Sequence, residues 1–343
     1  MPHAAVETPA SWLPLSAAEL DAARALVGQH VPPTPQRHWP LLSQRLGAEA
    51  WVKHENHAPT GAFKVRGGVL ALARLKQAHP ELPGIISATR GNHGQSLAFA
   101  ARIHGLRAVI CVPHGNSVEK NAAMRAFGAE LVEYGRDFDE ARVHAEGLAA
   151  EQGLCFVRSF HRDLVLGVAT YAHEFLTGAP ALDVVYVPIG MGSSICAMIA
   201  VRDLLGLQTE IVGVQAAGAP SYYESFRANR VVTTERATTQ ADGLATRVPD
   251  PVAVALIRRG ASRIVLADDT AIGAAIGIYF SDTHNLAEGA GAAALAAALQ
   301  EKDRYRGRRV GLVLSGGNID LPLFQSWTRQ SPVEPSGFPL SRE

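Results

Sequence analysis

The sequence predicts an α/β fold with parallel-rich, twisted sheets flanked by helices. From about residue 48 onward, short β-rich runs alternate with helix-length segments, which is the pattern of βαβ units. Several helix-length segments end at a glycine before the next β-rich run, as at Gly105, Gly128 and Gly153. Several β-rich runs are apolar throughout, as expected for strands in a sheet that is covered on both faces.

The length of 343 residues is enough for about two domains. An N-terminal helix is expected to begin at a capping box formed by Ser16 and Glu19, and the Pro-rich stretch 32–40 follows it. Strands are then expected at 49–53, 84–88, 107–112, 130–134, 154–158, 183–189, 210–215, 263–267 and 309–314. The tail from about residue 330 is rich in Pro and Ser, so we expect it to be irregular and to hold no regulatory domain.

The composition is that of a soluble protein with a large core, with 47% hydrophobic and 19% charged residues. Lys+Arg and Asp+Glu both number 32 and are mixed along the chain, which argues against nucleic acid or a membrane surface as a partner. Cys111, Cys155 and Cys196 form no C-x-x-C pair, so neither a zinc site nor a disulfide framework is expected. No secretory signal or membrane-spanning stretch is visible, and we expect a cytoplasmic location.

Lys64 is the candidate catalytic residue. The chain has only five lysines, and Arg supplies nearly all of its positive charge. Arg cannot form an imine with an aldehyde, whereas a desolvated Lys can lose its proton and do so. Lys64 lies in P-T-G-A-F-K-V-R-G-G, although this local context by itself favours an exposed surface lysine.

Residues 59–68 resemble the lysine motif of the serine/threonine dehydratase family, which reads roughly P-T-G-S-F-K-x-R-G-A. This family belongs to the tryptophan-synthase-β-like superfamily of pyridoxal 5′-phosphate (PLP) enzymes, fold type II. The resemblance runs in order through about 280 residues, from Thr34 to Asp320. It implies that Lys64 holds PLP as an imine, with Phe63 beside it.

The second motif is T-R-G-N-H-G-Q, between the expected strand 84–88 and a helical pattern. A strand end followed by a helix N-terminus offers backbone N–H groups to an anion, although such a motif can also be a helix cap alone. In the family this loop holds the substrate carboxylate, and its Asn contacts the ring oxygen of PLP. The resemblance assigns substrate binding to Thr89, Arg90, Gly91, Asn92 and His93, with Asn92 also binding the cofactor.

A glycine-containing loop directly follows the expected strand 183–189. Such a loop lets backbone N–H groups approach a phosphate, and the dipole of the next helix favours its charge. A dinucleotide fingerprint is the alternative, but Ile195 stands at its third glycine and Glu210 begins the next strand instead of ending it. The resemblance implies a phosphate cup formed by Gly190, Met191, Gly192, Ser193 and Ser194. Met191 and Ser193 replace family glycines there, which requires an ordinary φ at both, and Ser193 could donate its hydroxyl.

The fourth motif, L-S-G-G-N-I-D, follows the last expected strand, where a plain turn is the alternative. In the family its Ser faces the pyridine nitrogen, which implies that Ser315 binds the cofactor. A neutral hydroxyl does not keep that nitrogen protonated, so prompt loss of a β-leaving group is favoured over a long-lived carbanion. Two smaller matches contain Asp242, expected to be structural, and Glu288, which is either structural or catalytic.

The chain departs from the family pattern at Arg90, where dehydratases usually have Ser or Ala and serine racemase has a catalytic Ser. A guanidinium is always charged and is a poor acid or base, so racemization is not expected as the main activity. Arg90 could bind a distal carboxylate of the substrate, stack on an aryl ring, or form a plain salt bridge.

The family's divalent-cation loop, G-V-E-x-x-x-A-x-D, has Gln215 and Ser221 at its two acidic positions here. Neutral oxygens alone bind a hard cation weakly, so no metal site is expected. A family G-Q-G-T helix start is also changed, to the segment 167–170 (G-V-A-T), with no consequence that the sequence reveals.

The resemblance implies a large domain (1–79 and 159–343) and a small domain (80–158), with PLP in the cleft between them. It implies an ammonia-lyase that converts a β-hydroxy-α-amino acid, such as L-threonine or L-serine, to a 2-oxo acid and ammonia, and a homodimer by analogy. The alternatives are a dehydratase for a bulkier or acidic substrate (3-phenylserine, 3-hydroxyaspartate), a β-replacement synthase, or a PLP-binding protein without catalysis.

Overall fold

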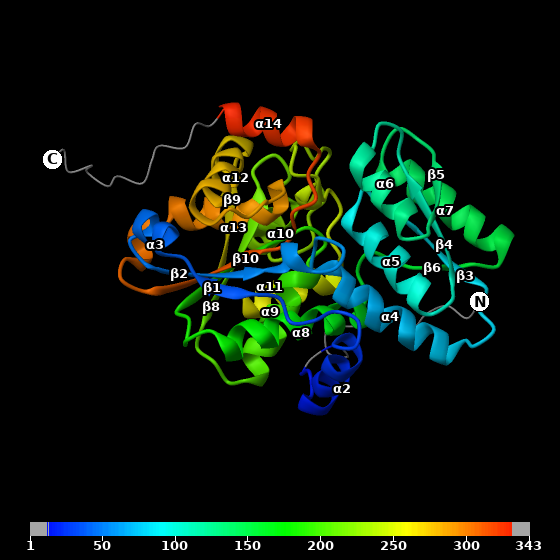
Figure 1. The fold of residues 1–343 in the computed structure, drawn as a ribbon, viewed down its shortest axis with the longest axis horizontal. Helices are drawn as coiled ribbons and strands as arrows, with labels where there is room; N and C mark the ends of the chain where they lie inside the picture. The colour runs from blue at the N-terminus through cyan, green and yellow to red at the C-terminus, as the bar shows by residue number, and fades with distance from the viewer. Residues whose placement is uncertain (1–11, 13, 331–343) are drawn as a thin grey trace.

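A computed structural model describes residue 12 and residues 14–330 of the chain. The chain folds around two separate sheets that lie side by side, each with helices around it (Figure 1). We call residues 84–156, which form the smaller sheet and its helices, the small unit, and the remaining described residues the large unit. The tail that the sequence predicts to be irregular lies outside the described residues.

The six-stranded sheet of the large unit has the order β1-β2-β10-β7-β8-β9. Its strands are β1 (Gln36–His38), β2 (Glu49–His54), β7 (Val184–Pro188), β8 (Glu210–Ala216), β9 (Arg263–Ala267) and β10 (Arg309–Leu314). All neighbouring strands are parallel except β1, which is antiparallel to β2. Strand β10 lies near the middle, where Leu312 pairs with Val52 on one side and Tyr186 on the other.

The four-stranded sheet of the small unit is entirely parallel, in the order β5-β4-β3-β6. Its strands are β3 (Gly84–Ala88), β4 (Arg107–Val112), β5 (Glu130–Glu133) and β6 (Cys155–Phe156). All four lie within the range 80–158 that the sequence predicts for a small domain. The exact limits of that domain stay a prediction.

All nine strands that the sequence predicts are present, so the predicted α/β fold with parallel-rich sheets is confirmed. Strand β1 is an addition, because its three residues are polar and lie in the Pro-rich stretch 32–40, where the sequence predicts no strand. It forms through its ladder with β2 at the edge of the sheet, where an exposed face needs no apolar pattern. Strand β6 is shorter than expected, since it pairs with β3 through two residues only.

Helices cover both faces of each sheet, as the apolar strands predict. The helices are α2 (Ala17–Val27), α3 (Pro40–Leu46), α4 (Lys64–Ala78), α5 (Asn92–Ile103), α6 (Val118–Ala126), α7 (Phe138–Gln152), α8 (Arg162–Gly178), α9 (Ser193–Leu204), α10 (Ser221–Ala228), α11 (Pro251–Gly260), α12 (Asp269–Thr283), α13 (Gly289–Gln300) and α14 (Leu321–Gln330). Short 3-10 helices are η1 (Glu55–His57), η2 (Asp242–Leu244) and η3 (Lys302–Tyr305). None of the described helices combines the length and apolarity needed to cross a membrane.

The side chains of β7 show how the large sheet is buried. Val185 and Val187 pack on the face covered by α8, α9 and α11, whereas Val184 and Tyr186 pack on the face covered by α12 and α13 (Figure 1). In the small unit, α7 covers one face of the sheet with alanines, and α5 and α6 cover the other. One apolar core runs from that second face to the large sheet through α4, so the two units are packed together.

The N-terminal helix α2 begins as the sequence predicts. The backbone N–H of Glu19 donates to the Ser16 hydroxyl at 3.2 Å, and the Ser16 N–H donates to the Glu19 carboxylate at 3.2 Å. This reciprocal pair satisfies two backbone donors that have no partner inside the helix. The predicted capping box is confirmed.

Candidate active site

Lys64 is the first residue of α4 and lies beside the carboxyl end of β10. The N–H of Phe63 donates to the carbonyl of Ser315 at 3.1 Å, and Ala62 forms an isolated bridge with Gly316. On the other side, the Ser96 hydroxyl of α5 donates to the Lys64 carbonyl at 2.6 Å. The start of α4 is therefore fixed to both units.

The Lys64 ammonium is set apart from other charges. Its Nζ lies 4.9 Å from the centre of the Phe63 ring and has no hydrogen bond or ion pair with any residue that the structure describes. Burial lowers the pKa of Lys64 to about 8, against an opposing effect of the Glu288 carboxylate. About half of this amine is therefore neutral near pH 8, where it can act as a nucleophile or a base.

A buried ionic network holds the next turn of α4. Arg66 is 1% exposed, and its guanidinium donates to Glu55 at 2.8 Å and to Glu174 at 2.7 Å. Lys53 donates to the second oxygen of Glu174 at 2.6 Å. The positive charges of Lys53 and Arg66 therefore neutralise the two carboxylates. Charges this deeply buried are stable only when paired and hydrogen-bonded, and here they fix the helix that carries Lys64.

The changed segment 167–170 packs against this same turn. A Cβ at Gly167 would lie 2.4 Å from the Arg66 carbonyl oxygen, so α8 can approach α4 only with a glycine there. The Thr170 hydroxyl accepts a bond from the Arg66 guanidinium at 3.2 Å. These two contacts give the segment the structural role that the sequence did not reveal.

The loop 89–93 joins β3 to α5, and α5 begins at Asn92. The Gly91 N–H donates to the Thr89 hydroxyl at 3.1 Å. The Asn92 side chain is held at both ends, since its Nδ2 donates to Glu288 at 2.6 Å and its Oδ1 accepts from Asn318 at 2.8 Å. The N–H groups of the first turn of α5 have no partner within the helix and remain available to an anion.

His93 is buried behind this loop. Its Nε2 lacks a hydrogen-bond partner among the described residues. Burial, and to a smaller extent the Lys64 ammonium, lowers the pKa of His93 to about 3. The imidazole is therefore neutral at physiological pH and contributes shape and a polar atom without a charge.

The loop 190–194 connects β7 to α9, whose first residue is Ser193. Gly192 has a φ of +99°. Met191 and Ser193 are not among the described residues with positive φ, so both have the ordinary φ that replacement of a family glycine requires. A Cβ at Gly190 would lie 2.2 Å from the Gly243 carbonyl oxygen, so that position tolerates only glycine. The Ser193 hydroxyl makes no hydrogen bond with a described residue.

Contacts around Tyr171 join this loop to Lys64. The Tyr171 hydroxyl lies 2.6 Å from the Ser194 hydroxyl, and its ring meets the Phe63 ring edge-to-face at 6.0 Å between centres. The Tyr222 hydroxyl donates to the Met191 carbonyl at 2.8 Å. The lysine, the glycine-containing loop and Ser315 are thus brought together from three separate parts of the chain.

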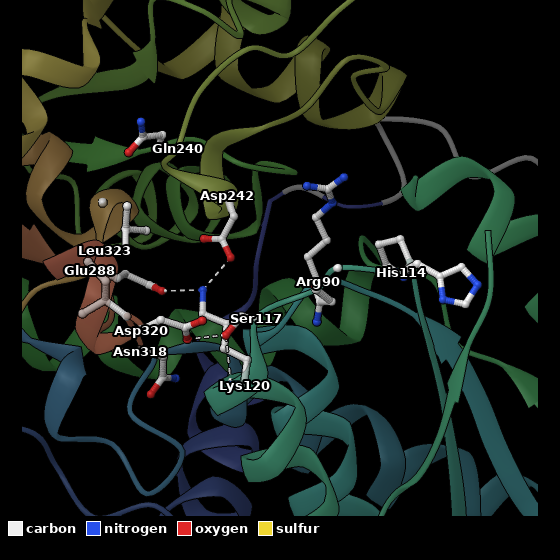
Figure 2. Close-up of a pocket in the computed structure, with 15 residues that line it drawn as sticks. Arg90, His114, Ser117, Lys120, Gln240, Asp242, Glu288, Asn318, Asp320 and Leu323 are labelled. Carbon is white, nitrogen blue, oxygen red and sulfur yellow. Dashed lines mark hydrogen bonds and ion pairs between the residues drawn. The ribbon is translucent and has the colours of Figure 1, made fainter. Parts of the chain in front are cut away.

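A cavity of about 330 Å³ lies between the two units next to this group. Arg90, His114 and Ser117 line it from the small unit, and Asp242, Glu288 and Asp320 line it from the large unit (Figure 2). Of the residues predicted to bind substrate, only Arg90 is among those lining it. Lys64, Ser315 and the loop 190–194 are not among the lining residues, and Asn92 is linked to the cavity through its bond to Glu288.

Arg90 is exposed and forms no hydrogen bond or ion pair with a described residue. The plain salt bridge that the sequence left open is therefore absent from the part of the chain that the structure describes. The guanidinium remains free for a ligand in the cavity.

Two residues in this region were missed by the sequence reasoning. Lys120 is buried and places its Nζ 2.5 Å from Asp242 and 3.3 Å from Glu288 (Figure 2). Asn318 donates both to Asn92 and to the Thr60 carbonyl, each at 2.8 Å. The scarcity of lysine could have indicated the first, and the second lies within the motif that contains Ser315.

The residues at the lost cation positions are used within the protein. The Gln215 side-chain oxygen accepts from the Tyr223 N–H at 2.9 Å, and the Ser221 hydroxyl donates to the Thr246 carbonyl at 2.7 Å. The described residues contain no group of three or more His, Cys, Asp or Glu placed to hold a metal ion.

The arrangement fits a phosphorylated aldehyde cofactor. It offers an unpaired amine of lowered pKa, a glycine loop at a helix N-terminus with the unpaired Ser193 hydroxyl, and a strand end beside the amine. A model of the family described as pyridoxal-phosphate dependent enzyme matches residues 27–316. The chain belongs to this family. Its cofactor is PLP.

Relatives of this PLP-dependent enzyme include ammonia-lyases. The L-threonine ammonia-lyase of Thermotoga maritima is 33% identical over 282 residues, covering 82% of this chain and 70% of the relative. The L-threo-3-hydroxyaspartate ammonia-lyase of Saccharomyces cerevisiae is 30% identical over 303 residues, covering 88% of this chain and 92% of the relative. The processed form of threonine deaminase isoform 2 from Solanum lycopersicum superposes with a TM-score of 0.85 at 27% identity, over 93% of this chain and 95% of that one. The predicted dehydratase-like PLP fold is confirmed.

Proposed function

We propose that this enzyme is an ammonia-lyase that dehydrates a β-hydroxy-α-amino acid, such as L-threonine or L-serine, to a 2-oxo acid and ammonia. The observation that carries the proposal is the placement of Lys64, an unpaired amine of lowered pKa, between Ser315 and the loop 190–194. The names of the L-threonine and L-threo-3-hydroxyaspartate ammonia-lyases to which the chain is similar support the reaction class.

The residues that would hold PLP come from three loops. Lys64 would bind its aldehyde carbon, and Phe63, Asn92 and Ser315 would surround the ring. The phosphate would be bound at the start of α9 by Gly190, Met191, Gly192, Ser193 and Ser194, where backbone N–H groups and the helix dipole favour an anion. When bound, PLP supplies an electron sink for the pair left at the substrate α-carbon.

The protein's own groups would then orient the substrate and move its proton. The α-carboxylate would be bound by the N–H groups at the start of α5 and by the hydroxyl of Thr89, with His93 neutral behind them. The Lys64 amine, once displaced by the substrate amine, would remove the α-proton, because burial keeps its pKa near the working pH. The β-hydroxyl would leave as water, with the phosphate held by the loop 190–194 as the proton donor, and the released enamine would be hydrolysed by water to the 2-oxo acid and ammonia.

A second candidate substrate is an acidic one, 3-hydroxyaspartate. Arg90 presents an unpaired guanidinium to the cavity between the units, and a relative at 30% identity is an L-threo-3-hydroxyaspartate ammonia-lyase. A guanidinium binds a carboxylate through two parallel hydrogen bonds, which fits the distal group of this substrate. The alternative is that the Arg90 guanidinium stacks on the aromatic ring of 3-phenylserine.

The test is release of 2-oxo acid by PLP-loaded protein given L-threonine, L-serine, L-threo-3-phenylserine or L-threo-3-hydroxyaspartate. Turnover of one of these, abolished in Lys64→Ala, supports the proposal, and the preferred substrate identifies the partner of Arg90. The control is Lys302→Met, which removes an exposed lysine on η3. If the bound cofactor shows its visible absorbance and all four compounds remain unchanged, the dehydratase proposal is wrong and a β-replacement reaction or PLP binding without catalysis takes its place.

Assembly and location stay predictions. Homodimer formation rests on analogy with the family, and light scattering of the purified protein would test it. Cell fractionation would test the cytoplasmic location. The division into domains at residues 80 and 158 is testable by limited proteolysis, because interdomain segments are cut first.

A further inference from the structure

The first turn of α6 crosses from the small unit to the large unit. The Ser117 hydroxyl donates to Asp320 at 2.5 Å, and the Glu119 carboxylate accepts from the Leu321 N–H at 2.9 Å. Lys120, the next residue along the chain, donates to Asp242 and Glu288. These contacts lie at the cavity between the units, so α6 is attached to the large unit at the place where a substrate would enter (Figure 2).

Lys120 is the buried, positively charged residue in this contact between the units. It is 6% exposed, and its Nζ lies between the carboxylates of Asp242 at 2.5 Å and Glu288 at 3.3 Å. A Cβ at Gly91 would lie 2.5 Å from the Lys120 Cδ, so the lysine stem passes directly over the loop 89–93. A residue kept only for packing does not require a desolvated ammonium here, since a Met would fill the same space.

Glu288 links Lys120 to the candidate active site through a second hydrogen bond. Its second oxygen accepts from the Asn92 Nδ2 at 2.6 Å, while the Asn92 Oδ1 accepts from Asn318 at 2.8 Å. Asn318 in turn donates to the carbonyl of Thr60, four residues before Lys64. A continuous chain of hydrogen bonds therefore runs from Lys120 through Glu288 and Asn92 to the loop that precedes α4.

The charge of Glu288 matters at both ends of this chain. Glu288 is 2% exposed, and burial raises its pKa, against the opposing effect of the Lys120 ammonium. Its carboxylate in turn opposes the lowering of the Lys64 pKa. Removing the positive charge of Lys120 should therefore raise the pKa of Glu288 further and favour its protonated form, with effects on Asn92 and on Lys64.

We propose that Lys120 is a positioning residue of the active site, which holds Glu288 as a carboxylate bonded to Asn92 and thereby sets the orientation of Asn92 toward the cofactor. This inference rests on the proposed roles of Asn92 and Lys64. The charged and titratable groups around Glu288 are Lys120 on α6, Asp242 on η2 and Lys64 on α4, with Arg90, His114 and Asp320 lining the same cavity.

The experiment compares Lys120→Met, Glu288→Gln and the double variant, with Lys302→Met as the control for loss of an exposed lysine. Glu288→Gln removes the charge and mimics the protonated carboxyl, whose neutral carbonyl oxygen accepts from Asn92 more weakly than a carboxylate does. The first readout is the PLP dissociation constant from pH 6 to 9, and the second is the pH dependence of the visible absorbance of the bound cofactor. Neither readout depends on turnover, so a failure of the proposed reaction would not obscure the result.

If Lys120 acts through Glu288, Lys120→Met weakens PLP binding by about tenfold or more at pH 6 and progressively less toward pH 9, because Glu288 loses its proton again as the pH rises. Glu288→Gln shows a loss that changes little with pH. The double variant resembles Glu288→Gln alone, since the two residues act as a unit. The absorbance titration shifts in both single variants and stays unchanged in Lys302→Met.

The opposite result would be a loss in Lys120→Met that is the same at every pH and that adds fully to the loss in Glu288→Gln. Lys120 would then be only a contact between the units, and the proposal would be wrong. Should Lys120→Met fail to fold, as shown by its thermal unfolding, Lys120→Gln replaces it and carries the same prediction.

Discussion

The backbone N–H of Phe63 donates to the carbonyl of Ser315 at 3.1 Å, which joins two motifs from opposite ends of the chain. This bond places the first residue of α4 beside the carboxyl end of β10. Ligand sites in parallel sheets form at the carboxyl ends of the strands, where the loops converge. The contact therefore fixes Lys64 at the one edge of the large sheet where the other loops can reach it.

The lowered pKa of Lys64 predicts a distinct reactivity in the PLP-free protein. Burial disfavours the ammonium, so half of Lys64 is neutral at pH about 8, whereas an ordinary lysine reaches that point near pH 10.4. Acylation by an amine-specific reagent, followed by mass spectrometry of each lysine peptide, should show Lys64 reacting at lower pH than exposed Lys302. Identical pH curves for the two lysines would contradict the prediction.

The buried network around Arg66 predicts a large loss of stability on its removal. Arg66→Met leaves Glu55 and Glu174 with one cation between them in the protein interior, which should lower the free energy of unfolding by about 3–5 kcal/mol. Urea denaturation measures it. The matched control is Arg24→Met, which breaks the exposed pair with Asp21 and should cost less than about 1 kcal/mol. A similar loss in both variants would show that the network is not what stabilises α4.

The close approach of α8 to α4 predicts opposite effects of the same substitution at two helical glycines. Gly167→Ala places a methyl group 2.4 Å from the Arg66 carbonyl oxygen and should destabilise the protein by at least about 1–3 kcal/mol. Gly147→Ala, in α7, meets nothing within 4 Å and should stabilise it by about 0.5–1 kcal/mol through helix propensity. Thermal unfolding of both variants tests the pair, and a stabilised Gly167→Ala would refute the contact.

Arg90 predicts a change in substrate preference. If its guanidinium binds a distal carboxylate, Arg90→Ser should lower kcat/KM for L-threo-3-hydroxyaspartate by about 10- to 100-fold, the equivalent of one charge-assisted contact. The value for L-threonine should change by less than about threefold, because its methyl group offers the guanidinium nothing to bind. Equal losses for both substrates would show that Arg90 stabilises the loop rather than the substrate.

Most of the fold could be read from local pattern. Strands such as 107–112 and 309–314 are apolar after a first, exposed arginine, and burial on both faces requires that pattern wherever they lie in the sheet. Strand β1 could not be read in this way, because its polar residues are held by pairing with β2 and not by burial. The lengths of β5 and β6 likewise depend on how far their neighbours extend.

The sequence by itself determined the motifs of the site, since the chemistry of Lys64, the small residues of the loop 190–194 and the hydroxyl of Ser315 are properties of short segments. Only the tertiary structure decided which charges face one another. Lys120 and Glu288 are 168 positions apart, and Asn92 and Asn318 are 226 apart. No local pattern encodes such pairs, because they exist only after the small unit has packed against the large unit and water has been excluded from the charges between them.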